Sequence, residues 1–360
     1  MKMEIVTKDL VLAALRKVED PELRKDLVSL NMIHDLEING DQVKFTVLLT
    51  TPACPLKTRI QNEARAAVVS VPGVNKVEVK MESNVPSDGR ARGLMQLPIR
   101  NAVAIASGKG GVGKSTVAVN VAVALAQAGA CVGLLDADIY GPNIPTMMGV
   151  ETLPPPTKEK LMPAEAYGVK MMSIGFLVKP DQPLIWRGPM LHSTIRQFLS
   201  DVEWGELDYL IVDLPPGTGD AALSLTQSLP LSGGVIVTLP QHISMEDARR
   251  GMEMFRQLNV PILGVVENMS YLELADGSRL DIFGTGGGEQ LAKEGGVPFF
   301  GTIPIEALVR EGGDNGKPII VENPKSPAAI ALRSIAEQIA AKVSVAAIEN
   351  RNVIPITIIE

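Results

Sequence analysis

The chain contains 360 residues, which at about 150 residues per domain predicts roughly two domains. It carries 34 Lys and Arg against 41 Asp and Glu, a net charge of −7, whereas proteins that bind duplex DNA usually present a strongly basic face. Hydrophobic residues make up 46% and charged residues 21%, a globular rather than a disordered composition. These values exclude a typical DNA-binding domain and an intrinsically disordered chain.

The sequence has only two cysteines, Cys54 and Cys131, which excludes a disulfide framework and favours a reducing compartment. The first ten residues have scattered charges where a signal peptide needs an apolar run. The most apolar stretch, residues 117–135, is interrupted by polar residues and glycines, so it is too polar to span a bilayer. We therefore expect a cytoplasmic protein.

A polar segment with proline and glycine, residues 84–93, divides the sequence. Residues 1–85 contain 12 basic and 12 acidic side chains, so the remainder carries the whole net charge. We expect a small α+β domain over 1–85, a linker over 86–98, an α/β domain over 99–343 and a C-terminal tail over 344–360.

The first domain combines helical and alternating patterns. Apolar residues at helical spacing from Leu10 to Val18 predict a helix, and the alternation from Val43 to Leu49 predicts a strand. A second helical pattern covers 60–68, and a second alternating run covers 74–79. The order predicts a strand–helix–strand unit.

From about residue 101, strand-like apolar runs alternate with helical patterns. The runs are Ala102–Ala106, Val132–Leu135, Tyr209–Val212, Val235–Thr238 and Ile262–Val266. This alternation is typical of a mainly parallel, doubly wound α/β sheet with helices on both faces. Such sheets bind ligands at the carboxyl ends of their strands. Cys131 begins one of the runs, and we expect it to be a buried core thiol.

The strongest motif lies between the first of these strands and the next helical pattern. It reads Gly108-Lys109-Gly110-Gly111-Val112-Gly113-Lys114-Ser115 and is followed by Thr116. The spacing matches G-x-x-x-x-G-K-[ST], the P-loop pattern, in which backbone N–H groups surround phosphate oxygens at a helix N-terminus. In this pattern Lys114 reaches the β- and γ-phosphates and Ser115 binds Mg²⁺. The motif predicts that residues 108–116 bind ATP with Mg²⁺.

Two acidic residues, Asp136 and Asp213, follow uninterrupted apolar runs. A carboxylate at the carboxyl end of a strand, beside a phosphate loop, can hold Mg²⁺ or orient the attacking water. We assign Asp213 to Mg²⁺ and Asp136 to the water. The stretches that follow them, 138–143 and 214–220, combine prolines and glycines, as loops that sense the γ-phosphate do.

Lys109 adds a second lysine to the phosphate loop, which then resembles the deviant Walker A motif of the MinD, ParA and nitrogenase-reductase ATPases. Further motifs narrow the resemblance to the Mrp/ApbC family of iron–sulfur cluster carrier ATPases: LDADIYGPN (135–143), WRGPM (186–190), DLPPGTGD (213–220), ENMS (267–270) and IFGTGGG (282–288). The first domain resembles the iron–sulfur cluster assembly domain often fused to these proteins, through residues 20–23, 30–33 and the loop of Cys54.

The resemblance implies an ATP-hydrolysing homodimer that encloses two nucleotides between its subunits. Lys109 would reach the nucleotide of the partner subunit, as an arginine finger does, and Asn268 would contact adenine. Lys109, Lys114 and Asp136 would then be the catalytic residues.

The bridging cluster site of the family is missing from this sequence. In many relatives a C-x-x-C pair precedes the IFG motif and holds a [4Fe–4S] cluster between two subunits, whereas residues 271–281 contain no cysteine. Cys54 is the remaining candidate ligand, because a thiol between a strand end and a helix start gains thiolate character from the helix N-terminus. A half-buried thiol in a turn is the alternative.

Three functional hypotheses follow. The first is an ATPase that carries iron–sulfur clusters, assembling them or transferring them to apo-proteins. The second is an ATP-driven adaptor that holds apo-proteins or a scaffold protein and binds no cluster itself. The third is a partition ATPase acting on DNA or membrane, which the acidic charge and the single basic residue within 344–360 disfavour. We expect protein partners, and neither nucleic acid nor membrane.

Overall fold

The computed structural model describes residues 6–88, 97–138, 141–157, 160–177, 188–219, 222–223, 226–227, 229, 231–274 and 276–351. Parts of three sequence motifs lie outside these ranges: Ile139–Tyr140, Trp186–Arg187 and Asp220. The chain divides into two compact units, Met1–Pro86 and Ser87–Glu360. None of the helices in the described ranges combines the length and hydrophobicity that a membrane span requires.

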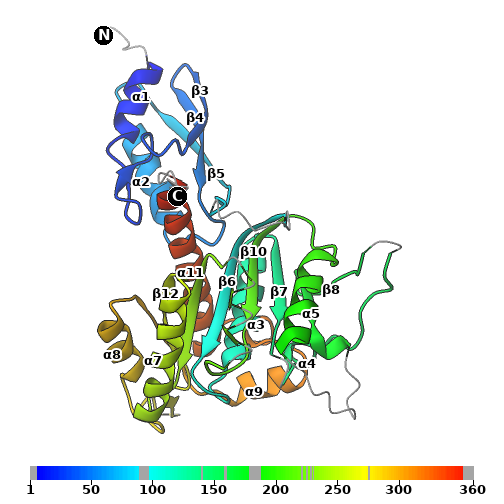
Figure 1. Ribbon diagram of the computed structural model, residues 1–360. Helices are drawn as coiled ribbons and strands as arrows, with labels where there is room; N and C mark the ends of the chain where they lie inside the picture. The colour runs from blue at the N-terminus through cyan, green and yellow to red at the C-terminus, as the bar shows by residue number, and fades with distance from the viewer. Residues whose placement is uncertain are drawn as a thin grey trace, which may run out of the picture. The chain divides into compact units, whose positions relative to one another are not determined.

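The described part of the first unit combines two helices with a three-stranded sheet (Figure 1). Its elements are α1 (Lys8–Leu15), β1 (Glu19–Asp20), β2 (Lys25–Asp26), β3 (Ile33–Asn39), β4 (Gln42–Leu49), α2 (Lys57–Val69) and β5 (Lys76–Ser83). β4 is antiparallel to β3 and parallel to β5, because α2 carries the chain back across the sheet. The predicted strand–helix–strand unit is β4, α2 and β5.

In the second unit, eight strands of the described residues form one sheet in the order β15-β12-β11-β6-β10-β7-β9-β8. The strands are β6 (Ile99–Ser107), β7 (Val132–Asp136), β8 (Ala164–Ala166), β9 (Val169–Ser173), β10 (Leu207–Asp213), β11 (Gly233–Thr238), β12 (Ile262–Glu267) and β15 (Phe299–Thr302). Neighbours are parallel except for β8 and β9, which confirms the predicted mainly parallel sheet. The apolar runs did not identify β8 and β15, which are short, or β9, which Lys170 interrupts.

Helices cover both faces of this sheet (Figure 1). α5 (Gly188–Ser200), α7 (His242–Gln257) and α8 (Gly287–Gly295) share one core cluster with Ala104 and Val212. α3 (Lys114–Gln127) and α11 (Pro327–Arg351) pack against each other and against the sheet. The shorter elements are α4 (Ile144–Met147), η1 (Ile174–Phe176), β13 (Leu272–Glu273), β14 (Arg279–Leu280), α9 (Ala307–Asp314) and α10 (Ile319–Glu322).

The end of the second unit differs from the expected tail over 344–360. α11 continues to Arg351, because Val343, Ser344 and Ala347 are buried at helical spacing and extend its packed face. Residues 352–360 lie outside the described ranges. At the other end of the unit, the Asp88 carboxylate accepts a hydrogen bond of 2.7 Å from Ser232 Oγ, which attaches the start of the expected linker to the second unit.

Candidate functional site

The loop 108–116 joins the central strand β6 to the first turn of α3. Gly111 and Gly113 have φ of +80° and +82°, a conformation that glycine adopts without strain. A Cβ atom on Gly113 would lie 2.1 Å from Asn268 Nδ2, so a larger residue would displace that side chain. The loop thus turns tightly and presents the N-terminus of α3 at the carboxyl edge of the sheet.

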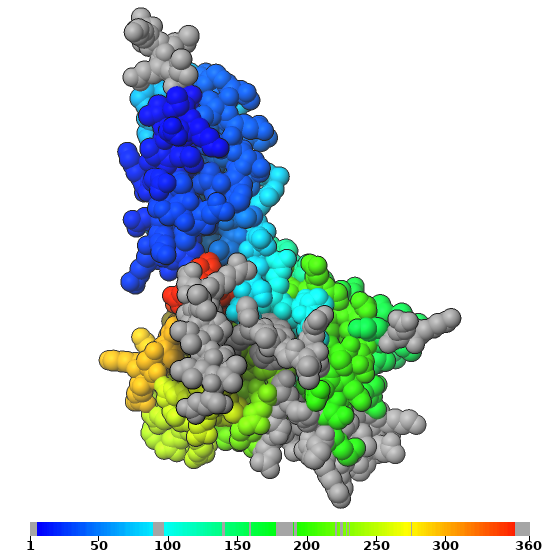
Figure 2. Space-filling view, turned by 45° about the horizontal axis from the view of Figure 1, so that its top comes forward, coloured from blue at the N-terminus to red at the C-terminus, as the bar shows by residue number. Residues whose placement is uncertain are grey.

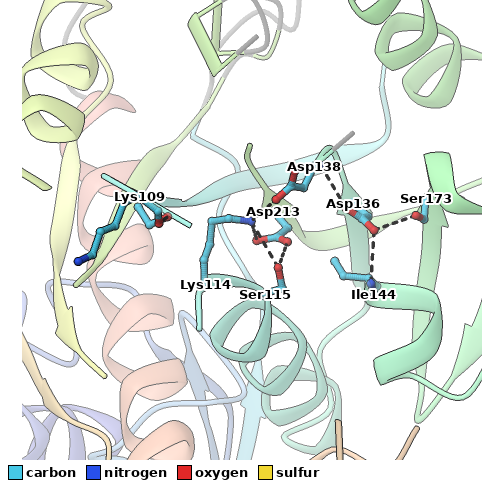
Figure 3. A network of polar contacts seen from close by, with 9 residues as sticks. Lys109, Lys114, Ser115, Asp136, Asp138, Ile144, Ser173 and Asp213 are labelled. Atoms are coloured by element: carbon cyan, nitrogen blue, oxygen red, sulfur yellow. Dashed lines mark hydrogen bonds and ion pairs between the residues drawn. The ribbon is translucent and has the colours of Figure 1, made fainter. Parts of the chain in front are cut away.

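Lys114, Ser115 and Asp213 form a compact polar group at the start of α3 (Figure 3). Lys114 Nζ donates to Asp213 Oδ1 over 2.7 Å, and Ser115 Oγ donates to Asp213 Oδ2 over 2.6 Å. Burial raises the pKa of Asp213, and the Lys114 ammonium opposes that rise. The structure therefore brings together the lysine, hydroxyl and carboxylate that we assigned to phosphate and Mg²⁺ binding.

Asp138 belongs to the same group, although the motif alone had marked it only as the start of a loop. Its Oδ2 lies 3.4 Å from Lys114 Nζ. It lines a cavity of about 360 Å³ together with the phosphate loop and Pro216. Asp138 stands two residues beyond the end of β7, and this position outside the strand is the sequence signal that could have identified it.

Asp136, which we assigned to the attacking water, is fully buried. Its Oδ1 accepts the Asp138 N–H over 3.1 Å, and its Oδ2 accepts the Ser173 hydroxyl over 2.8 Å and the Ile144 N–H over 3.4 Å (Figure 3). Burial, and after it the charge of Asp213, raises the pKa of Asp136 to about 7. The Asp136 carboxylate is directed toward β9 and α4, so Asp136 is not among the described residues that line the phosphate cavity. Asp138 lines that cavity instead.

A second cavity of about 490 Å³ adjoins the first and shares Thr116, Asn143 and Met147 with it. Its other lining residues are Thr146, Asn268, Met269, Pro304, Ile305, Glu306, Val309, Arg310, Gly313 and Asp314. Asn268 Nδ2 donates to Val112 O over 2.8 Å, which ties this wall to the phosphate loop. This cavity combines apolar side chains with polar and charged ones and lies next to a phosphate loop, an arrangement that suits the base and sugar of a nucleotide.

Lys109 also lines the phosphate cavity, but its ammonium points away from Lys114 and Asp213 (Figure 3). Ser107 Oγ donates to Lys109 O over 2.9 Å and holds the backbone of the loop at this point. The phosphate pocket therefore has Lys114 inside and Lys109 directed outward.

The two cysteines lie in different units. Cys54 is half-buried between β4 and α2, packs against the core of the first unit, and its carbonyl accepts the Lys57 N–H over 3.2 Å. Cys131 is exposed, so the expectation of a buried core thiol is wrong. The reason is that β7 begins only at Val132, so Cys131 precedes the core of the sheet. The part of the chain that the structure describes contains no group of three or more His, Cys, Asp or Glu residues arranged to hold a metal ion.

A glycine loop that opens a helix, with a lysine and a hydroxyl beside a buried strand-end aspartate, defines a P-loop NTPase. A family model described as the NUBPL iron-transfer P-loop NTPase matches residues 98–340, and the chain belongs to this family. A second model, described as an iron-sulfur cluster assembly protein, matches residues 8–81. Both resemblances predicted from the motifs are thereby confirmed.

The chain is similar to named proteins over almost its whole length. It is 57% identical to an "Iron-sulfur cluster carrier protein" of Synechocystis sp., over 96% of this chain and 100% of that protein. A protein with the same description from Deinococcus radiodurans is 51% identical, over 94% of this chain and 96% of the relative.

Solved structures match about two thirds of the chain. An Archaeoglobus fulgidus nucleotide-binding protein in complex with ADP is 40% identical, with a TM-score of 0.56 over 64% of this chain and 90% of that chain. The Pyrococcus furiosus cell division ATPase MinD is 23% identical, with a TM-score of 0.52 over 66% of this chain and 98% of that chain, and shows the shared fold.

Proposed function

We propose that this protein is an ATP-hydrolysing carrier of iron–sulfur clusters that assembles clusters or transfers them to apo-proteins. The observation that carries the proposal is that one chain combines a formed phosphate site with a cluster-assembly domain. A relative that matches this chain over 96% of its length is described as a cluster carrier, which supports the same function. Free thiols persist in a reducing compartment, so we place the protein in the cytoplasm. We propose that its partners are proteins rather than nucleic acid or membrane.

The residues of the phosphate site fit Mg²⁺ and ATP. Mg²⁺ prefers hard oxygen ligands, and Ser115 Oγ and the Asp213 carboxylate supply them side by side. Bound Mg²⁺ would neutralise charge on the phosphates. Lys114 binds the β- and γ-phosphates, and the N–H groups of 108–116 surround their oxygens. Asn268 contacts the base in the adjoining cavity.

Hydrolysis requires a positioned water and positive charge on the transferred phosphoryl group. In this proposal Asp138 orients the water, since its carboxylate faces the phosphate cavity and lies beside Lys114. Lys109 of a partner subunit adds the charge, which makes the active form a homodimer. Gly217, in the loop after Asp213, donates its N–H to Ser107 O over 2.9 Å, so loss of the γ-phosphate can be transmitted to that loop through β6.

The cluster is the cargo, and Cys54 is the ligand that we propose for it. It is the one cysteine of the cluster-assembly domain, and a pair of subunits would supply two such thiolates. Anaerobic reconstitution with iron and sulfide tests this assignment by the iron bound per dimer. We expect the wild type and Cys131→Ser, the matched control, to bind iron and Cys54→Ser to lose it. Equal iron in all three proteins would refute the role of Cys54.

The adaptor is the second candidate, and the sequence of residues 271–281 favours it, because this stretch has no cysteine where many relatives carry the C-x-x-C pair. An adaptor would hydrolyse ATP and bind apo-proteins but take up no iron in the wild type or in either variant. The same reconstitution therefore separates the two functions.

A further inference from the structure

Glu267, the last residue of β12, holds both ends of an excursion of the chain from the sheet. The excursion covers residues 270–288 and contains the hairpin of β13 and β14. Glu267 is fully buried. Its Oε1 accepts the Ser270 hydroxyl over 2.5 Å, and its Oε2 accepts the Gly288 N–H over 2.6 Å. One carboxylate therefore fastens the first residue and the last residue of the excursion, with one oxygen for each.

The contact with Gly288 lies at the N-terminus of α8. The residue before this helix, Gly286, provides no side-chain acceptor, so Glu267 satisfies an N–H group that the helix leaves free. Its negative charge is favourable at this end of a helix. A Cβ atom on Gly288 would lie 2.7 Å from Glu267 Cβ, so glycine permits the approach. α8 packs beside α7 (Figures 1 and 2), where Arg249 forms an ion pair with Glu294.

The residue after Glu267 is fixed to the phosphate loop. Asn268 donates its backbone N–H to Thr238 O over 2.8 Å and its side-chain N–H to Val112 O over 2.8 Å. Met269 then turns the chain with φ of +52°, which is strained for a residue with a side chain. Short, buried contacts thus connect Val112 of the phosphate loop with the base of the excursion.

The excursion presents an apolar surface. Leu274, Leu280 and Ile282 are 42%, 50% and 48% exposed. The Arg279 guanidinium lies over the Tyr271 ring at 4.1 Å from its centroid and braces the hairpin. A hairpin this short has little stability of its own, so its order depends on its attachments, which include the Glu267 contacts and the bridge between Leu272 and Ile305.

We infer that Glu267 is a positioning residue that couples the nucleotide site to residues 271–286, so that nucleotide bound at the phosphate loop orders this surface. The inference rests on the proposed nucleotide binding. Nucleotide contacts restrain Val112 and Asn268, and the Glu267 carboxylate passes the restraint to Ser270 and Gly288. Glu267→Met keeps the length of the side chain but removes both acceptor oxygens, so neither the Ser270 hydroxyl nor the Gly288 N–H keeps its partner.

Hydrogen–deuterium exchange of the full chain, with and without Mg²⁺ and the non-hydrolysable analogue AMP-PNP, tests the coupling. In the wild type we expect the analogue to slow exchange across 271–286 on the order of fivefold. In Glu267→Met we expect the analogue to bind within about threefold of the wild-type Kd and to leave exchange in 271–286 unchanged. Glu273→Met, the same change at an exposed residue of β13, should behave as the wild type.

If Glu267 had only a structural role, its substitution would speed exchange equally with and without nucleotide. The decisive quantity is therefore the difference in exchange between the nucleotide-bound and the nucleotide-free protein. Ser270→Ala, which removes one of the two contacts, provides a milder variant and should reduce that difference without abolishing it. Equal slowing in the wild type and both variants would overturn the inference, as would a wild-type hairpin that ignores bound nucleotide. Failure of the wild type to bind AMP-PNP at all, measured separately, would overturn the proposed function as well.

Discussion

Asp136 and Asp213 are direct neighbours on the parallel strands β7 and β10, and of the two it is Asp213 that bonds to Lys114. Asp136 instead accepts the N–H groups of Asp138 and Ile144. Two aspartates with the same place at the end of an apolar strand thus face different partners. Asp213 belongs to the phosphate site, whereas Asp136 holds the backbone that carries Asp138.

The raised pKa of Asp136 predicts an unusual pH dependence of stability. Its pKa in the folded state is about 7, above the ordinary value of 3.8, so the folded protein holds a proton that the unfolded chain releases. The resulting stabilisation is complete below about pH 4 and is lost as the pH rises through about 7. Asp136→Asn removes this contribution.

Urea unfolding of the nucleotide- and Mg²⁺-free protein measures the effect. Between about pH 4 and pH 7 the wild type should lose on the order of a few kcal/mol relative to Asp136→Asn, with little further change above about pH 8. A difference between the two proteins that stays constant with pH would show that Asp136 does not titrate in this range.

Lys114→Ala should abolish ATP turnover without unfolding the protein. Loss of the ammonium removes the charge that binds the phosphates, and the buried Asp213 carboxylate then takes up a proton rather than remaining charged and unpaired. Phosphate release and a thermal melt measure the two properties. Lys317→Ala removes an exposed lysine from a surface ion pair and should keep turnover within about twofold. Turnover retained by Lys114→Ala would mean that the nucleotide site is misassigned.

Mixed dimers can decide whether Lys109 acts on the nucleotide of its partner. Lys109→Ala and Asp138→Asn should each lower kcat by about 100-fold or more when assayed alone. In a mixed dimer, one site combines the intact Asp138 of one subunit with the intact Lys109 of the other. Random mixing in equal amounts should therefore restore about a quarter of the wild-type rate. No recovery, in dimers shown to exchange subunits, would place Lys109 and Asp138 of the same subunit at one site.

Gly113→Ala should destabilise the nucleotide-free protein by about 1–3 kcal/mol. The substitution forces alanine to φ near +82° and brings its Cβ against the Asn268 amide. Gly110→Ala is the matched control in the same loop, because a Cβ there meets no atom within 4 Å, and it should change stability by less than about 0.5 kcal/mol. Equal unfolding midpoints in urea would contradict the importance of this close approach.

The parts of the site that depend on local sequence could be predicted, and those that depend on distant partners could not. The phosphate loop and Asp213 follow from a motif and from a strand that ends in a carboxylate. The direction of Asp136 depends on the Ser173 hydroxyl, 37 residues away, which no local pattern connects to it. Cys131 shows the same limit in the fold. An apolar run predicts a strand, but it does not predict which residue is the first to be buried.

The strand order has a consequence for how the second unit unfolds. The acidic residues end strands β7 and β10 on one side of β6, whereas Asn268 and the wall of the second cavity between Pro304 and Asp314 follow β12 and β15 on the other side. A nucleotide that contacts both sides binds only when both are folded, so its binding free energy stabilises them jointly. With saturating nucleotide the two sides should therefore unfold together in one cooperative transition rather than separately, because the ligand binds across the carboxyl edge of the sheet.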